Sequence, residues 1–304
     1  MPGEPLVTVL MSVYNDAAFV AESVSSIQSQ SLKDLEFVII DDGSTDGTKG
    51  ILARLADERT RVIHNERNIG LTASLNRGLD AARGCYVARM DGDDVAELQR
   101  LEKQAAFLNM HPDIGILGCS RRLIDEEGKE LGVARALEED LSIRWKCLLG
   151  NPFAHPTVML RRELLSRHRL RYGESFRTAQ DYELWTRLLP HTRGANFAEP
   201  LLRYRLRNGI SRQSKAEQLA NHDRIALLAN RRLLPGFPLN ADQIRELRGR
   251  YGGHSVREPH MRPDDAVWLG VYRGMLEAFT SAHARHEGLA SFRKTMRPPM
   301  PSAA

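Results

Sequence analysis

The sequence lacks the features that define several large classes of protein. It has only three cysteines, Cys85, Cys119 and Cys147, and their spacing fits no metal-binding motif. The first residues have neither the basic start nor the apolar core of a signal peptide, so we expect reduced thiols. No apolar run approaches the ~20 residues that a membrane-spanning helix needs. These absences favour a cytoplasmic protein.

Two glycine-rich nucleotide-binding motifs are also missing. No Gly-x-Gly-x-x-Gly follows the first predicted strand, and no Gly-Lys-Ser/Thr loop is present. This argues against a dinucleotide site and against a P-loop. The remaining composition is that of an ordinary globular protein, with 42% hydrophobic and 27% charged residues. Its 304 residues suffice for two domains, or for one large domain with an appendage.

The excess of positive charge lies near the end of the chain, whereas residues 1–204 hold 26 Lys and Arg against 30 Asp and Glu. The net charge is +4, but residues 205–304 hold 17 Lys and Arg against 9 Asp and Glu. A basic C-terminal third could contact an anionic membrane, a lipid phosphate or nucleic acid. Solvated helix faces explain the same charge equally well. No recognisable nucleic-acid motif is present, so we expect no nucleic-acid partner.

Apolar runs and helical periodicity alternate through the first ninety-odd residues. Strands are predicted at residues 6–13, 35–40, 61–64 and 86–90, and amphipathic helices between them. This alternation predicts an α/β fold with a mainly parallel central sheet and helices on its faces.

An acidic cluster follows the fourth predicted strand. Asp91, Asp93 and Asp94 surround Gly92 at the carboxyl end of that strand, where ligands bind in open α/β sheets. Three adjacent like charges repel unless a cation joins them, and Mg²⁺ and Mn²⁺ prefer such oxygen ligands. The pattern indicates a metal–diphosphate site; the alternative is a solvated acidic loop. A calcium loop of the EF-hand type fails because Val95 and Ala96 stand at positions that need an oxygen ligand and a glycine.

Polar residues also follow the other predicted strands, and these loops should converge at one edge of the sheet. Such groups suit a nucleotide, because carboxylates bind ribose or base donors and an aromatic ring packs on a base. Asp42 could equally be a turn or cap residue. The candidate residues are Ser12, Tyr14, Asp42, Asn68 and Gly70.

The second half of the chain departs from strict alternation. A hairpin around Gly128 and a strand at residues 155–160 predict a mixed sheet, and residues 201–205 suggest an edge strand. An amphipathic helix begins near Asp181, which favours a carboxylate in its first turn, and Trp185 on it is as easily a core side chain. Further helices are predicted at residues 216–234, 241–250 and 264–286, before a frayed tail at 297–304.

From Val7 to about Ser214, the chain resembles inverting glycosyltransferases of family 2. The resemblance lies in the joint order of six segments. They are residues 9–15, 39–48, 68–70, 90–94, 155–158 and 180–185. It implies a Rossmann-like GT-A fold over residues 1–210, with a nucleotide-sugar half at about 1–95 and an acceptor half at about 96–210. Residues 211–304 would form a helical C-terminal extension.

The resemblance also implies individual roles. Asp91 and Asp93 match the family's Asp-x-Asp motif, which holds Mn²⁺ or Mg²⁺, with Asp93 the first candidate for direct ligation. Asp181 matches the general base, although the usual preceding Glu is Gln180 here. His155 and Trp185 are candidates for the acceptor side. The residues implied for the nucleotide sugar are Ser12, Tyr14, Asp42, Asn68, Gly70, Asp91 and Asp93.

The implied reaction moves a sugar from a nucleoside-diphosphate sugar, most commonly a UDP-sugar in the family, to a hydroxyl of a glycan or lipid-linked acceptor. Polysaccharide or glycolipid biosynthesis, with peripheral contact at the inner face of the membrane, would suit it. One alternative is a sugar-phosphate nucleotidyltransferase, which normally carries a Gly-rich basic loop where Ser12–Asp16 stand. The other is a non-enzymatic, basic nucleic-acid- or membrane-binding protein.

Overall fold

The fold is described here from a computed structural model, which covers residues 4–207, 215–251 and 265–296. The predicted frayed tail at 297–304 lies outside these residues. The strands are β1 (Val7–Val13), β2 (Leu35–Asp41), β3 (Thr60–His64), β4 (Tyr86–Asp91), β5 (Val95–Ala96), β6 (Ile114–Ile124), β7 (Glu130–Ala134), β8 (Met159–Arg161) and β9 (Arg193–Arg205). The helices are α1 (Val20–Gln28), α2 (Thr48–Leu55), α3 (Leu71–Ala81), α4 (Arg100–Met110), α5 (Asp140–Cys147), α6 (Arg162–Arg167), α7 (Gln180–Leu188), α9 (Lys215–Leu233), α10 (Ala241–Tyr251), α11 (Asp265–Ala282) and α12 (Leu289–Thr295), with short 3₁₀ turns η1 (His155–Thr157) and η2 (Leu189–His191).

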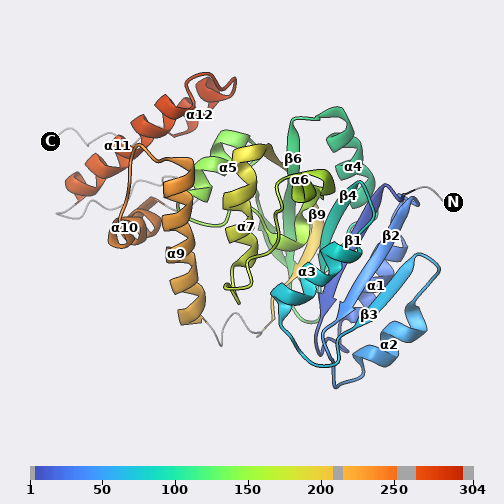
Figure 1. Ribbon diagram of the computed structural model, residues 1–304. Helices are drawn as coiled ribbons and strands as arrows, with labels where there is room; N and C mark the ends of the chain where they lie inside the picture. Colours follow the sequence, from blue (N-terminus) through green and yellow to red (C-terminus); the bar gives the residue numbers. More distant parts are fainter. Residues whose placement is uncertain (1–3, 208–214, 252–264, 297–304) are drawn as a thin grey trace.

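One mixed sheet runs through the molecule (Figure 1). Its strand order is β3-β2-β1-β4-β8-β6-β9-β5, and β7 pairs with β6. The first four strands are parallel, as the sequence predicts, and β8 lies antiparallel between β4 and β6. The carboxyl ends of β1, β2 and β4 therefore open at the same edge.

Two apolar clusters cover the two faces of the sheet. Because neighbouring side chains on a strand point to opposite faces, Val9 and Met11 belong to one cluster and Leu10 to the other. Helices α1, α2 and α4 cover the first face, and α3, α5 and α7 cover the second. The result is a three-layered α/β domain.

The C-terminal helices extend the second apolar cluster. The ring of Trp145 on α5 meets Phe279 at 5.3 Å and Phe292 at 6.1 Å between centroids. Helix α9 packs on α7, and Figure 1 shows all four C-terminal helices on the side of the sheet away from α1 and α2. Helices α9 to α11 confirm the predicted ones, whereas α12 was not predicted.

None of the described helices combines the length and apolar composition that crossing a bilayer requires. The boundary at residue 210 stays a prediction.

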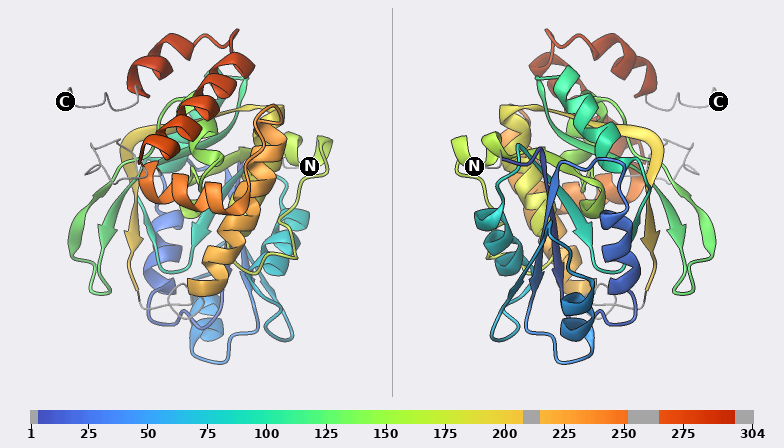
Figure 2. Two further views of the ribbon diagram at one scale, coloured as in Figure 1. Left: turned by 90° about the vertical axis from the view of Figure 1, so that its left-hand side faces the viewer. Right: turned by 90° about the vertical axis from the view of Figure 1, so that its right-hand side faces the viewer.

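Strand β9 differs from the edge strand predicted at residues 201–205. It begins at Arg193, pairs in parallel with β6 and carries β5 on its other side. The register shifts near Ser120, opposite Pro200, and this irregular stretch hid the strand in the sequence pattern. The longer strand carries its last residue, Arg205, to Asp93 and Asp94. Figure 2 shows the course of β9 in yellow.

Candidate active site

The three predicted carboxylates meet in one place. Strand β4 ends at Asp91, and the turn that follows brings ligand oxygens of Asp91, Asp93 and Asp94 within 4.8 Å of one another. They form the acidic loop, residues 91–94. Apart from this loop, the described residues contain no comparable cluster of three His, Cys, Asp or Glu side chains.

The charges in the acidic loop are unfavourable without a cation. Burial, together with Asp91 and Asp16, raises the pKa of Asp93 to about 6. Burial and the two neighbouring carboxylates also raise the pKa of Asp94 well above its usual range. Oδ2 of Asp94 is buried and has no hydrogen-bond partner among the described residues. Clustered oxygens, mutual repulsion and an unpartnered buried oxygen all fit a hard divalent ion.

The loop after β1 adds a fourth carboxylate. A Cβ on Gly92 would lie 2.6 Å from Cγ1 of Val13 and 3.0 Å from Oδ2 of Asp16, so only glycine lets the two loops touch. Arg207 donates to Oδ1 of Asp16 at 2.6 Å and to Oδ2 of Asp93 at 3.3 Å. Asp16 was not among the residues predicted for the site, and its place beside the acidic loop was missed.

A buried arginine lies beneath Asp91. Arg89 is 2% exposed, and its Nη1 forms an ion pair with Oδ1 of Asp91, two residues on and on the same face of β4. Burial has the largest effect on two further groups: it raises the pKa of Asp181 and lowers that of His155. The charge of Arg89 acts on both in addition and lowers each pKa. Arg89 thus lies within electrostatic reach of both predicted centres.

The residues predicted for the nucleoside lie along the same edge. Ser12 is paired in register with Asp91 on one side and Ile40 on the other, and the exposed ring of Tyr14 follows two residues later. Asp42 is buried and accepts hydrogen bonds from the backbone amides of Ile69 and Gly70, both at 2.9 Å. Its carboxylate therefore shapes the loop before α3.

The rest of that loop is held by similar short contacts. Oδ1 of Asn68 accepts from the amide of Gly70 at 3.0 Å, and Nδ2 of Asn65 donates to Asp42 at 2.7 Å. Gly70 has φ +92°, a left-handed conformation that favours glycine. The contact of these residues with a nucleotide stays a prediction.

Asp181 lies in the first turn of α7. Its Oδ2 accepts a hydrogen bond from Nδ2 of Asn151 at 2.6 Å, and the residue is 7% exposed. Burial raises the pKa of Asp181, whereas Asn151 and the amide of Tyr182 oppose the rise. The residue before α7, Ala179, has φ +58° and ψ +23°, so the chain turns sharply into the helix at this point.

The two acceptor-side candidates lie deeper than expected. Trp185 is fully buried, with its ring 6.0 Å from that of Phe153, so it supports the site from the core and cannot face an acceptor directly. His155 is half-buried, and its Nε2 lies 2.9 Å from the hydroxyl of Tyr172. Burial raises the pKa of the Tyr172 hydroxyl; Arg89 opposes the rise, and the charges of Asp181 and Asp91 add to it.

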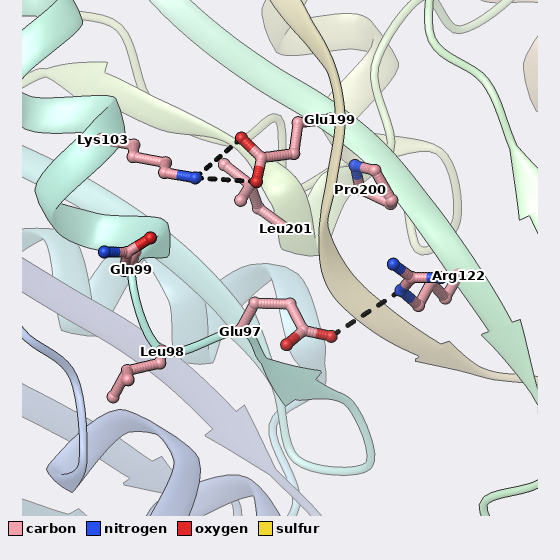
Figure 3. Close-up of a pocket in the computed structure, with 8 residues that line it drawn as sticks. All are labelled: Glu97, Leu98, Gln99, Lys103, Arg122, Glu199, Pro200 and Leu201. Carbon is pink, nitrogen blue, oxygen red and sulfur yellow. Dashed lines mark hydrogen bonds and ion pairs between the residues drawn. The ribbon is translucent and has the colours of Figure 1, made fainter.

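A separate hollow of about 240 Å³ lies outside strands β5 and β9 (Figure 3). Its charged side chains pair with each other, Lys103 with Glu199 at 2.7 Å and Arg122 with Glu97 at 4.0 Å. None of the residues predicted for the site lines it. The chemistry of the acidic loop is therefore distinct from this hollow.

Comparison with known proteins shows to which family this chain belongs. Residues 8–169 match the sequence profile of the family described as glycosyl transferase family 2. The chain therefore belongs to glycosyl transferase family 2. This confirms the resemblance found in the motifs, and the chain is an enzyme of the glycosyltransferase class.

Curated relatives agree with this membership. A Bacillus subtilis protein, EpsE, whose name describes it as a glycosyltransferase, is 38% identical over 213 residues, covering 67% of this chain and 74% of the relative. An uncharacterized glycosyltransferase of Haemophilus influenzae is 34% identical over 215 residues. The match covers 66% of this chain and 66% of the relative, just under two thirds of each. An O-antigen biosynthesis glycosyltransferase of Escherichia coli, WbnJ, is 32% identical over 69% of this chain and 83% of its own.

Solved structures confirm the fold. S. aureus TarS (residues 1–349, with UDP-GlcNAc) superposes with a TM-score of 0.65 at 20% identity, covering 95% of this chain and 90% of that one. The mannosyltransferase PcManGT of Pyrobaculum calidifontis, in complex with GDP-Man and Mn²⁺, gives 0.60 at 19% identity, covering 97% and 84%. The predicted GT-A fold with C-terminal helices is therefore correct.

Proposed function

We propose that this enzyme moves a sugar from a nucleoside-diphosphate sugar to an acceptor hydroxyl by a single inverting displacement that depends on Mn²⁺ or Mg²⁺. The observation that carries the proposal is the acidic loop, in which three carboxylates converge at the carboxyl edge of the sheet around an unpartnered buried oxygen. The ligands of TarS and PcManGT, UDP-GlcNAc and GDP-Man with Mn²⁺, support a nucleotide-sugar donor and a divalent ion. A UDP-sugar is the first donor to test.

On the donor side, Asp91 and Asp93 would hold the ion, with Asp93 the direct ligand. When bound, a divalent ion supplies positive charge to the diphosphate leaving group. Ser12 and Tyr14 would receive the nucleoside, and Asp42 keeps the loop of Asn68 and Gly70 in the shape that borders it. Arg89 holds Asp91 from beneath through their ion pair.

On the acceptor side, Asp181 would take the proton from the attacking hydroxyl. Burial raises its pKa toward the working range of a base, while Asn151 orients the carboxylate through Oδ2. His155 and Tyr172, which are 2.9 Å apart at Nε2 and the hydroxyl, would form the floor of the acceptor side.

The acceptor would be a glycan or a lipid-linked saccharide, as the O-antigen relative suggests.

Peripheral contact with a membrane through the basic C-terminal helices belongs to the same proposal. Several arginines there are already paired, including Arg248 with Asp223 at 2.7 Å, so the available charge is smaller than the sequence implies. Flotation with neutral and anionic vesicles at low and high salt tests this; equal behaviour would remove the membrane from the proposal.

Thermal stabilisation by a panel of nucleotide sugars, with and without Mn²⁺, tests the donor side. A ligand that binds only the native state at a hundredfold excess over Kd adds ~2.7 kcal/mol. Asp93→Ala should abolish the Mn²⁺-linked part and transfer itself. Asp80→Ala is the matched control, because that surface carboxylate pairs with Arg171 away from the site. Full transfer in excess EDTA would overturn the metal-dependent mechanism.

A further inference from the structure

Arg205 connects three distant parts of the chain around the acidic loop. It is the last residue of β9 and is 4% exposed. Its Nε donates to the carbonyl oxygen of Asp93 at 2.9 Å, and its backbone amide donates to Oδ1 of Asp94 at 2.8 Å. These two contacts hold the main chain of Asp93 and the side chain of Asp94.

The far side of the guanidinium is held as firmly. Its Nη2 donates to Oε2 of Glu22 on α1 at 2.6 Å. Its Nη1 donates to the carbonyl oxygens of Asp125 and Glu126, at 3.0 and 2.9 Å, in the turn between β6 and β7. The ring of Phe19 packs against it at 4.9 Å from its centroid. Every nitrogen of the guanidinium therefore has a protein partner.

Arg205 occupies no carboxylate oxygen of the two proposed metal ligands, Asp91 and Asp93. It binds the main-chain oxygen of Asp93, whereas Oδ2 of that residue is contacted by Arg207 at 3.3 Å. Glu22 also neutralises the guanidinium of Arg205, so the contact adds little positive charge beside a site meant for a cation.

We propose that Arg205 is a positioning residue for the divalent ion: it fixes the acidic loop in its ligating shape, and Glu22 neutralises and orients it. The proposal rests on metal binding by Asp91 and Asp93, as given under the proposed function. Loss of partners that orient metal ligands typically weakens metal affinity by about 10–100-fold.

The test is Mn²⁺ affinity, measured by calorimetry with Mn²⁺ alone and with Mn²⁺ plus UDP. Arg205→Gln should weaken Mn²⁺ binding by about 10–100-fold. Arg205→Lys should fall between wild type and Arg205→Gln, because lysine keeps the charge but not the planar fork. Glu22→Gln should weaken binding in the same direction by a smaller factor, because it leaves the charge of Arg205 uncompensated.

Arg161→Gln is the matched control. Arg161 is also partly buried and binds backbone carbonyls, those of Ile114 at 2.8 Å and His111 at 3.0 Å, but it is paired in register with Tyr86 at the opposite end of β4. This variant should lower the melting temperature and leave Mn²⁺ affinity within about twofold of wild type.

Three outcomes decide the matter. Mn²⁺ affinity unchanged in the Arg205 variants, in a wild type that binds Mn²⁺, overturns the positioning role and leaves the proposed function standing. An equal loss in Arg161→Gln shows a general effect of stability and also overturns it. Absence of Mn²⁺ binding in the wild type overturns both. If Arg205→Gln does not fold, Arg205→Lys and Glu22→Gln give the answer, and unchanged affinity in both rejects the proposal.

Discussion

The acidic loop and the C-terminal helices treat charge in opposite ways. On α9 and α10, Arg245 and Arg248 both pair with Asp223. In the acidic loop, three carboxylates share one place, and burial and repulsion raise the pKa values of two of them. The charges on α9 and α10 are neutralised pair by pair, whereas repulsion persists in the acidic loop even though Arg89 pairs with Asp91 and Arg207 with Asp93.

The comparison separates two kinds of substitution. Changes at carboxylates of the proposed site should alter chemistry with little loss of stability, and changes at the neutralised pairs of the C-terminal helices should do the reverse. The sequence counts only charges per segment, so the basic C-terminal third and the acidic loop look equally exceptional there. Only the contacts in the folded chain distinguish the neutralised arginines of the C-terminal helices from the clustered carboxylates of the acidic loop.

The largest effect is expected at Asp181. Asp181→Asn keeps the size and the acceptor for Asn151, so stability should change by under ~1 kcal/mol. Turnover should fall by ~10²–10⁴-fold, because the variant has no base to accept the proton. The measurement pairs donor affinity with transfer rate on the same variant. Normal donor binding with near wild-type transfer would remove Asp181 from the mechanism.

The next effect should appear in the paired region. Arg248 donates to Asp223 and, through Nε, to the carbonyl of Leu149 at 2.6 Å, joining α10 to α9 and to the segment after α5. Arg248→Ala should lower the free energy of unfolding by about 1–3 kcal/mol, since it strips two charged hydrogen bonds. Transfer by the folded variant should match wild type. A loss of turnover without a loss of stability would contradict the comparison.

A pH dependence follows from the pKa of Asp93, which is about 6. Below that value a proton occupies the carboxylate and competes with the metal, so Mn²⁺ affinity should fall by about tenfold per pH unit between pH 6 and 5. Above pH 7 it should level off. Titrations of Mn²⁺ at several pH values measure this, and an affinity that is flat between pH 5 and 7 would exclude Asp93 as the direct ligand.

The smallest effect concerns the metal-free protein. The pKa of Asp93 in the folded protein, about 6, exceeds its ordinary value of 3.8, so the stability contributed by the protonated form is lost as pH rises through about 6. Asp93→Asn should therefore raise the free energy of unfolding at pH 7 in EDTA by roughly 1–2 kcal/mol. The gain should vanish at pH 4, where the native Asp93 is protonated. Urea unfolding at both pH values gives the answer, and a less stable variant at pH 7 would refute it.

Features that lie within one helix, strand or loop could be predicted from the sequence. Periodicity located β1, β2 and β4, and the run from Asp91 to Asp94 carried its chemistry in four consecutive residues. The GT-A fold followed from the order of such local segments, and the structural comparison confirmed it.

Features formed between distant elements could not be predicted. Arg205 acts on Asp94, 111 residues earlier, and no periodicity records such a contact. In the sequence, Arg89 is only one residue of a predicted strand. Its ion pair with Asp91 depends on its burial, and that burial depends on the helices that cover this face of the sheet, α7 among them. Trp185 was offered as an acceptor contact, although its apolar helix position already allowed a core role, and the packed structure gives it that role.

The separation between Arg205 and the loop it braces has a consequence for synthesis. The strands that carry Ser12, Asp42 and Asp91 leave the ribosome first, but the last brace of the acidic loop lies 111 residues further along the chain. At roughly 5–20 residues per second, that interval lasts about 6–22 s. Throughout it the nascent chain carries Ser12, Asp42 and the acidic loop without Arg205, so the proposed metal site can be completed only late in translation.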